Sequence, residues 1–520
     1  EGARYLQPSN ETLYSLYREL EFKGLLSRLE PPAEPVPIAN EVLLEGDYQS
    51  YTGVTEPADY TRIAALIDDA ASRERVAVAL QGDAVAISVD DHVGFSFLRA
   101  ALDDAPAVGA AFRTLWERVP QLVVYDVKTV IGRLGVPARI VADDPMLAAH
   151  ILNPSRTFAE IGQAASQFLE RTLPEEPAAA ADAAGLLARA TRAELERRGQ
   201  LALYTDVELP LASVLAALER VGIAVDPAAL RELAVEVDAD VARLQGEIYA
   251  IAGEEFNLGS PLQLGRILFD KLNLPAGRRN KTGYATDDAE LQRLRGFPIA
   301  QLIQEYREVS KLKNTYIDVF PTLVDAHGRL HTTFRQTATA TGRLSSINPN
   351  LQNIPVRGEI GRRIRKAFVA PSPDRVLLGA DYSQIELRLM AHLSGDAAMR
   401  QAFHEGQDIH DFTARQIFDV GPFAEVDGNQ RRMAKSVNFG LLYGMSDFGL
   451  AQRLEIDRAS AKTMMQAYFA RFPSVRDYIE RSLDTAREKG YVETILGRRR
   501  YMPDLRAKNY MLRAAAEREA

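Results

Sequence analysis

The stretch Val376-Leu377-Leu378-Gly379-Ala380-Asp381-Tyr382-Ser383-Gln384-Ile385-Glu386-Leu387-Arg388 decides the fold that we expect for the second half of the chain. Its first part, Val376–Ala380, is an apolar run of strand length and predicts a short buried strand. Residues that can face a core then recur at helical spacing, at Ile385, Leu389 and His392/Leu393. They predict a helix that ends at Gly395. Asp381 would stand at the strand end, where open sheets expose side chains for chemistry. The alternative is that Asp381 only caps the helix.

Composition places the protein among ordinary globular chains. Its 520 residues suggest roughly three domains, and 46% hydrophobic and 26% charged residues argue against disorder. The absence of cysteine excludes disulfides and thiolate metal sites. We see no apolar run of membrane-span length and no secretory signal at Glu1-Gly2-Ala3-Arg4, so we expect a cytoplasmic protein without a membrane segment.

Charge is unevenly distributed. The net charge of -9 argues against a uniformly basic surface, but residues 331–370 carry seven Lys and Arg against Glu359 alone. This basic stripe consists of Arg335, Arg343, Arg357, Arg362, Arg363, Arg365 and Lys366. Cations clustered in this way suit a polyanion such as nucleic acid, because each one placed on a phosphate releases a counterion. The alternative is a solvated charged face.

Along the chain, a helix over Glu11–Leu29 and a Pro-rich linker come first, followed by an α/β pattern. The expected strands of this pattern are Arg75–Leu80, Ala84–Val89 and Leu122–Val124. The Ala-rich run Glu175–Ala184 fits either an exposed helix or a mobile connection. Long helices over Pro227–Ile251 and Ile299–Val324 suggest an arm. The chain begins without Met, and its last predicted helix near Lys508–Ala520 lacks a stop signal, so we expect a fragment of a longer protein.

A second informative stretch runs from Arg431 to Gly444. Arg431, Lys435, Phe439 and Tyr443 are spaced by four, so a helix would present all of them on one side. Two cations before two aromatic rings match a nucleoside triphosphate, with phosphates on the cations and base and sugar on the rings. The alternative is an amphipathic helix with snorkelling cations and core aromatics.

These stretches resemble family A DNA polymerases, the DNA polymerase I type, and the resemblance covers nearly the whole chain. Residues Asp381–Arg388 resemble the first palm motif of the family, and Arg431–Gly444 resemble its fingers helix. Thr339–Ser346 and Asn350–Pro355 resemble the segment that contacts primer and template. The resemblance implies an α/β and α+β multidomain fold, with an exonuclease-like domain followed by a right hand. The implied parts are a nuclease tail and linker (1–40), a degenerate 3′→5′ exonuclease-like domain (41–205), a helical thumb (206–330), an incomplete palm (331–400) and helical fingers (401–520).

The resemblance also implies a mechanism and its residues. Phosphoryl transfer to a primer end would use two Mg²⁺ ions bridged by Asp381, with the backbone carbonyl of Tyr382 as a further ligand. The nucleotide-binding residues implied are Arg431, Lys435, Phe439, Tyr443, Glu386, Gln384 and His410. The DNA-binding residues implied are Arg343, Asn350, Gln352, Asn353, Arg357, Lys311 and Lys313. Glu386 would block a ribose 2′-hydroxyl, and a Phe at position 439 is associated with discrimination against dideoxynucleotides. For His410 a cap or core role remains open, and for Glu386 a surface charge.

Two departures from the family pattern bear on activity. The family's second catalytic carboxylate lies in a His-Asp-Glu motif that does not occur in this sequence, so we expect the 520-residue chain not to polymerise. The strand that should carry an Asp-x-Glu metal pair reads Val76-Ala77-Val78-Ala79-Leu80-Gln81, and Ala178 stands where a Tyr is expected. Asp126 and Asp182 are the acids that match, which predicts no proofreading.

Primer-template DNA and deoxynucleoside triphosphates are therefore the expected partners, and we expect a monomer. A DNA-binding protein without catalysis is one rival interpretation. A single-subunit RNA polymerase is another, against which Glu386 and the exonuclease-like domain argue.

Overall fold

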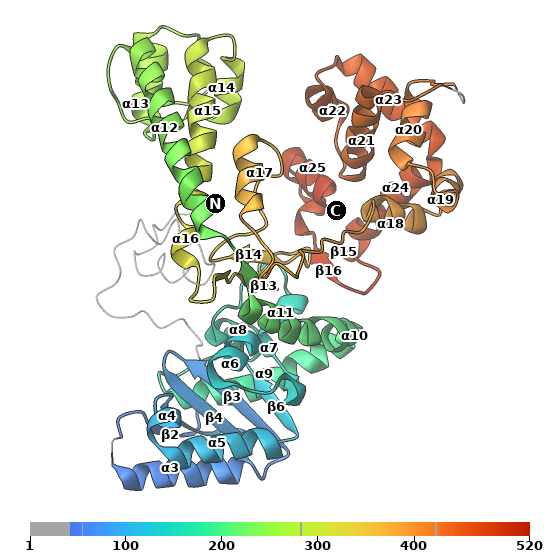
Figure 1. Ribbon diagram of the computed structural model, residues 1–520. Coiled ribbons are helices and arrows are strands. Elements are labelled where there is room, and N and C mark those ends of the chain that lie inside the picture. The colour runs from blue at the N-terminus through green and yellow to red at the C-terminus, as the bar shows by residue number, and fades with distance from the viewer. Residues whose placement is uncertain (1–41, 55, 281–282, 422–423) are drawn as a thin grey trace, which may run out of the picture. The chain divides into compact units, whose positions relative to one another are not determined.

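The computed structural model describes residues 42–54, 56–280, 283–421 and 424–520 (Figure 1). The chain divides into two compact units, which are described separately below. Residues 1–213, 336–343 and 380–520 belong to the first unit, and residues 214–335 and 344–379 to the second. The predicted helix Glu11–Leu29 and the linker after it lie outside the described residues. The fold is multidomain, with an α/β part and mainly helical parts, as the sequence predicts.

A six-stranded mixed sheet organises the N-terminal part of the first unit. The strand order is β2-β5-β4-β3-β6-β7, with β3 antiparallel to β4 and parallel to β6. The strands are β2 (Asp47–Tyr51), β3 (Arg75–Gln81), β4 (Ala84–Asp90), β5 (Val93–Leu98), β6 (Gln121–Val124) and β7 (Val141–Asp143). Three of them confirm the strands predicted from the sequence.

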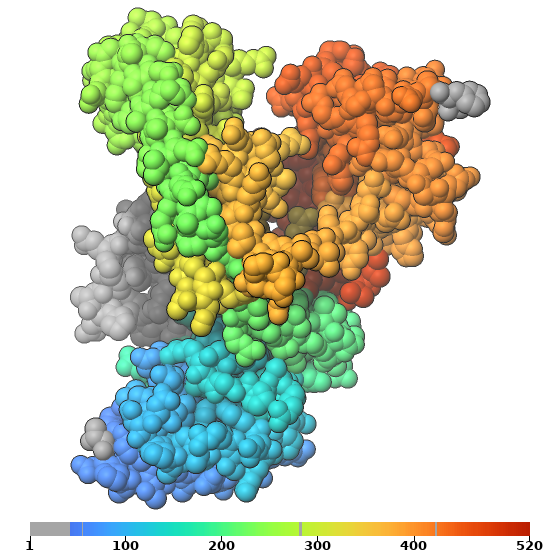
Figure 2. Space-filling view, viewed as in Figure 1, coloured from blue at the N-terminus to red at the C-terminus, as the bar shows by residue number. Residues whose placement is uncertain are grey.

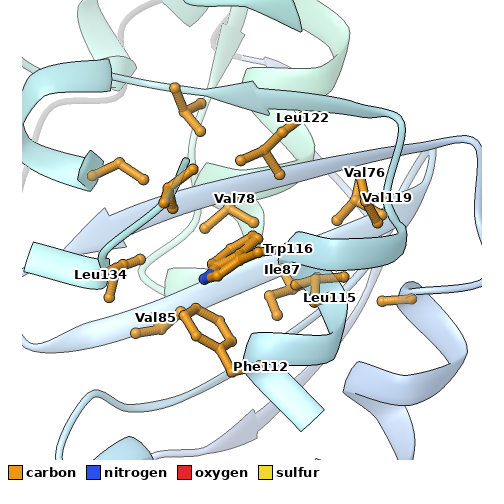
Figure 3. Packing of buried hydrophobic residues seen from close by; sticks show 14 of the residues in the cluster. Val76, Val78, Val85, Ile87, Phe112, Leu115, Trp116, Val119, Leu122 and Leu134 are labelled. Carbon is orange, nitrogen blue, oxygen red and sulfur yellow. The ribbon is translucent and has the colours of Figure 1, made fainter. Parts of the chain in front are cut away.

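One face of this sheet packs against large side chains of α3 (Pro57–Ala70) and α5 (Pro106–Arg118). Val76 and Val78 of β3 share this core with Phe112 and Trp116 of α5, whose rings meet edge to face at 4.4 Å (Figure 3). Strand side chains alternate between the two faces, so Ala77 and Ala79 must point the other way.

The second face is covered by α9 (Pro177–Arg197). Ala77 and Ala79 contact an alanine-rich side of this helix, where Ala181 and Ala184 are fully buried. Methyl side chains let the helix backbone approach the strands closely. The Ala-rich run is therefore a buried core helix. The helix is confirmed, but the expected exposure and the alternative of a mobile connection were wrong.

Shorter elements complete this part: β1 (Val42–Leu43), α4 (Ala101–Asp104), α6 (Val127–Leu134), α7 (Pro145–Leu152), α8 (Ile161–Phe168) and β8 (Arg171–Thr172). A continuous helix then spans Leu201–Val221, as α10 (Leu201–Leu203), a π-helical turn (Tyr204–Glu208) and α11 (Leu209–Val221). By length and composition alone, this helix is apolar enough to cross a membrane. Within the protein, 28% of its most apolar window is buried. Reading uninterrupted apolar runs missed it, because Asp206 and Glu208 break the run.

In the second unit, α12 (Pro227–Ala252) and α15 (Pro298–Leu312) lie side by side (Figures 1 and 2). Asp226 caps α12 by accepting hydrogen bonds from two backbone N–H groups of its first turn, with proline at the first helical position. The other elements are β9 (Ile223–Ala224), α13 (Pro261–Gly265), β10 (Arg279–Asn280), β11 (Gly283–Tyr284), α14 (Asp288–Arg293), α16 (Phe320–Leu323), β12 (Arg329–Leu330), β13 (Thr333–Arg335), β14 (Ser345–Ile347) and α17 (Glu359–Lys366). The predicted helix Pro227–Ile251 is confirmed. The helix predicted over Ile299–Val324 is instead divided into α15, a π-helical turn (Lys313–Ile317) and α16.

The C-terminal part of the first unit is mainly helical and shares one apolar core. Its elements are α18 (Ile385–Ser394), α19 (Ala397–His404), α20 (Ile409–Ile417), α21 (Gly428–Leu442), α22 (Asp447–Leu454), α23 (Arg458–Arg471), α24 (Pro473–Lys489), β15 (Tyr491–Glu493), β16 (Arg499–Tyr501) and α25 (Tyr510–Glu519). Leu387 of α18, Ile409 of α20 and Val437 of α21 are fully buried together.

The predicted strand Val376–Ala380 does not form. The side chains of Val376 and Leu378 are 84% and 91% exposed, and no described strand pairs with this segment. An apolar run becomes a strand only where another strand accepts its hydrogen bonds. The helix after it is confirmed and ends at Gly395, but it buries Leu387, Met390 and Ala391 instead of the predicted stripe. The predicted stripe of Ile385, Leu389 and Leu393 is exposed.

Candidate nucleotide and nucleic-acid site

Asp381 is exposed and makes no hydrogen bond or ion pair within the described part of the chain. It does not cap α18, because Gln384 occupies the N-cap position. Gln384 has a left-handed backbone with φ of 53°, which costs a non-glycine residue free energy and is found disproportionately at functional sites. The sequence alternative of a helix cap at Asp381 is therefore wrong.

Helix α21 displays Arg431 and Lys435 to solvent. A capping box between Asp427 and Gln430 fixes its first turn. From there Arg431 and Lys435 are exposed, while Val437 and Leu441 are buried in the core. Phe439 is half-buried, and Tyr443 lies at the C-cap with 53% exposure. The geometry confirms a helix that is polar on one side, and Lys435 on that side has no ion pair among the described residues.

Arg431 is held by two acids at the start of α20. Its guanidinium lies 2.5 Å from Asp408 Oδ2 and 3.1 Å from Asp411 Oδ1. Burial alone would raise the pKa of Asp408, but hydrogen bonds from Arg431 and from the backbone N–H groups of His410 and Asp411 outweigh it and lower that pKa. Motif reading missed both acids, because an N-cap Asp before a helix signals only a cap.

Glu386 is the meeting point of three segments. Its Oε1 accepts a 2.5 Å hydrogen bond from the Tyr443 hydroxyl and lies 3.5 Å from Arg343 Nη2. Burial, followed by the hydrogen bond to Glu386, raises the pKa of Tyr443. Three residues that the family resemblance marks separately are thus joined by one carboxylate.

His410 lies in the first turn of α20 and is buried, with 3% exposure. Its Nδ1 faces the side-chain amide of Asn438 at 3.0 Å, and its ring centroid lies 5.8 Å from that of Phe439. Burial lowers the pKa of His410; Asp408 opposes this shift, and Arg431 and Lys435 add to it. His410 is therefore both a core histidine and a neighbour of the α21 cations.

The predicted DNA-binding residues of the second unit differ in whether their side chains are already bonded within the protein. Gln352 donates to Leu344 O and accepts from Ser346 N, so it shapes its own loop, and Asn350 accepts from Gln352 N. Lys313 is held by carboxylates: its Nζ lies 2.7 Å from Asp318 and 3.2 Å from Asp238.

The remaining predicted contacts are open to solvent. Lys311, Asn353 and Arg357 are exposed, and Asn353 uses its backbone carbonyl to accept from the Tyr316 hydroxyl. In the basic stripe, Arg363 forms a paired contact with Glu236 at 2.5 and 2.7 Å, whereas Arg357 has no ion pair among the described residues.

A two-metal site is not complete in these side chains. Among the described residues, no group of three His, Cys, Asp or Glu could hold a metal ion. Asp381 and the Tyr382 carbonyl are hard oxygen donors of the type that Mg²⁺ prefers, but they supply two ligands where an octahedral ion takes six. The donor set of the described residues therefore does not fit a pair of ions.

Comparison with known proteins decides the family. The DNA polymerase family A profile matches residues 227–520, more than half of the chain. The chain belongs to DNA polymerase family A. It is 51% identical over 386 residues to the thermostable DNA polymerase I of Thermus filiformis, and 37% identical over 548 residues to DNA polymerase I of Geobacillus stearothermophilus. These matches cover 73% and 99% of this chain but only 45% and 61% of the two relatives.

A solved family A structure is similar in fold. The POL domain of Pol1 from M. smegmatis, in complex with DNA primer-template and dNTP, superimposes with a TM-score of 0.79 at 38% identity. The alignment covers 91% of this chain and 84% of that one.

In this family A chain, the acids of the α/β part are engaged within the protein. Asp182 is 1% exposed and accepts hydrogen bonds from the Tyr48 hydroxyl at 2.7 Å and from His92 N at 2.9 Å. Asp126 caps α6 and accepts from Thr129. A tyrosine thus reaches Asp182, but from β2 instead of the position four residues earlier, which is Ala178.

Proposed function

We propose that this chain is the body of a template-directed DNA polymerase that binds primer-template DNA and a deoxynucleoside triphosphate. The observation that carries this proposal is the order of side chains along α21. The exposed cations Arg431 and Lys435 precede the rings of Phe439 and Tyr443, and the Tyr443 hydroxyl contacts Glu386. The cations would bind phosphates, and the rings would pack on sugar and base. Asp381 would stand beside the primer end, where it supplies one carboxylate. Residues 206–330, 331–400 and 401–520 would act as thumb, palm and fingers.

We further propose that the 520-residue chain binds these partners without extending the primer, because Asp381 has no partner carboxylate in the described residues. This favours DNA binding without catalysis for this chain. We also propose that the protein acts in the cytoplasm as a monomer.

The test measures primer-template affinity with the matching nucleotide, with a mismatched one and with none, in Mg²⁺. Tightening only with the matching deoxynucleotide is expected, together with no extension. Equal tightening by a ribonucleotide would favour an RNA polymerase relative. Loss of the effect in Lys435→Ala, with Lys462→Ala as an exposed control on α23, would tie it to α21.

We propose no 3′→5′ exonuclease activity for the α/β part, since Asp182 is buried under Tyr48 and β3 carries no acid. Incubation with a labelled single strand and Mg²⁺ is expected to leave the strand intact. Degradation that Asp126→Ala abolishes would refute this proposal.

A further inference from the structure

Asn438 is a buried amide in the middle of α21. It is 0% exposed and lies among the apolar residues that α21 turns toward the core. A buried amide is costly unless its oxygen and its nitrogen both find partners. Here Oδ1 accepts from the hydroxyl of Thr413 at 3.1 Å, and Nδ2 faces His410 Nδ1 at 3.0 Å.

The contact determines which ring nitrogen of His410 carries the proton. Thr413 is itself 0% exposed, and its hydroxyl occupies the amide oxygen, so the amide NH₂ is the group turned toward the ring. A neutral imidazole that accepts at Nδ1 carries its one proton on Nε2. His410 Nε2 makes no hydrogen bond with any described residue, which leaves that N–H available to a ligand.

We propose that Asn438 is a positioning residue for nucleotide binding: it holds the proton of His410 on Nε2, so that this N–H donates to the triphosphate. The proposal rests on the proposed function, which puts the phosphates beside Arg431 and Lys435. The opposite tautomer would direct a nitrogen lone pair at an anion and would repel it. Thr413 contributes because its hydrogen bond to the amide oxygen prevents the amide group from rotating by half a turn.

The tautomer can be observed without any activity measurement. In protein labelled with ¹⁵N-histidine, the two ring nitrogens of a neutral imidazole differ widely in chemical shift, and the resonance absent from His410→Gln assigns the residue among seven histidines. A protonated Nε2 and an unprotonated Nδ1 are expected for His410. A proton on Nδ1 would overturn the proposal.

Two variants test the cause. Asn438→Leu removes the donor at nearly constant size, and Thr413→Val removes the hydroxyl that orients the amide. Both are expected to shift His410 toward a mixture of tautomers. Thr463→Val makes the same chemical change at an exposed site, where the hydroxyl bonds only to Ala459 O, and should leave the His410 signal unchanged. Thr413→Val keeps the test valid if Asn438→Leu fails to fold. An unchanged His410 tautomer in a folded variant would refute the role of Asn438.

Nucleotide affinity on primer-template completes the test. Asn438→Leu and His410→Gln are each expected to weaken binding by roughly 10- to 150-fold, the range for a hydrogen bond to a charged group. The double variant should be no weaker than His410→Gln alone, because both changes remove one contact. Additive losses would overturn the proposal. If Lys435→Ala and His410→Gln both bind nucleotide normally while the tautomer is as stated, the proposed function fails and the tautomer assignment stands.

Discussion

Glu386 connects Arg343 and Tyr443, which lie far apart in the sequence, and the Tyr443 hydroxyl orients its carboxylate through a 2.5 Å hydrogen bond. A gate against the ribose 2′-hydroxyl works only if the carboxylate stays in place. We therefore expect Tyr443→Phe to keep the aromatic ring for packing but to lower the preference for deoxy- over ribonucleotide binding by roughly tenfold, from one lost charge-assisted hydrogen bond.

Binding of both nucleotides to the complex with primer-template measures this preference. Tyr510→Phe, which removes a hydroxyl from an exposed tyrosine on α25, is the matched control and should leave the preference unchanged. If Tyr443→Phe weakens both nucleotides equally, the hydroxyl does not act through Glu386.

Asp144 gives the α/β part a specific pH dependence. It is 0% exposed, caps α7 and accepts from the backbone N–H groups of Asp126, Val127 and Met146. Burial raises its pKa from 3.8 to about 7. Between these values the folded state binds more proton than the unfolded state, so this group's contribution to stability falls as pH rises and levels off above about 7.

From pH 5 to pH 8 the loss from Asp144 is expected to reach about 2–3 kcal/mol at most. Denaturant unfolding of the whole chain at both pH values checks it. We expect Asp144→Asn to be less stable overall, because it loses a hydrogen-bond acceptor. Its free energy of unfolding should nevertheless lack the decrease between pH 5 and pH 8 that Asp144 causes in the wild type. Asp103→Asn, an exposed carboxylate on α4, is the control. An identical pH response in wild type and Asp144→Asn would contradict the assignment.

The four-residue spacing predicted that Arg431 and Lys435 lie exposed on one side of a helix, and that exposure is confirmed. Their role in nucleotide binding stays a prediction. Asp408, Asp411 and Asn438 were missed, because their roles depend on the packing of α20 against α21, which no local pattern reports.

Among the elements, α9 is the one whose small side chains matter most. Its alanines lie directly on β3 and β4, and Ala181 is 0% exposed. We expect Ala181→Leu to destabilise the chain by about 1–3 kcal/mol, because added methylenes in a close-packed core displace their neighbours. Chemical denaturation measures the change.

Ala193→Leu makes the same substitution at an exposed position of α9 and should change stability by less than about 0.5 kcal/mol. Equal effects at the two positions would mean that helix propensity, and not packing against the sheet, limits this helix.

The strands of the α/β sheet were predictable because each apolar run pairs with neighbouring strands that carry the same apolar pattern. Val376–Ala380 has the same apolar signature but pairs with no described strand, and it is exposed. The Ala-rich run was ambiguous for the opposite reason: low complexity resembles a linker, and only the facing Ala77 and Ala79 show that alanine was needed for close packing.

At the scale of the molecule, a chain of net charge -9 is proposed to bind a polyanion through local cations. Free and paired cations should then differ in the salt dependence of DNA binding. Arg357→Ala is expected to reduce the slope of log affinity against log salt by roughly 0.9, since one phosphate contact is lost. Arg363→Ala should reduce it less, because Arg363 is already neutralised by Glu236. Titrations of primer-template DNA at several salt concentrations measure both, and equal slopes in the two variants would contradict the distinction.

The exposed segment Val376–Ala380 also governs how the purified protein behaves in a tube. An exposed apolar stretch whose backbone groups pair with no described strand can form hydrogen bonds with the same stretch in another molecule. Self-association should therefore rise with protein concentration and be relieved by a charge or a proline at Leu377, independently of DNA. The lack of a pairing strand at Val376–Ala380 is thus expected to limit the concentration at which the protein stays monomeric.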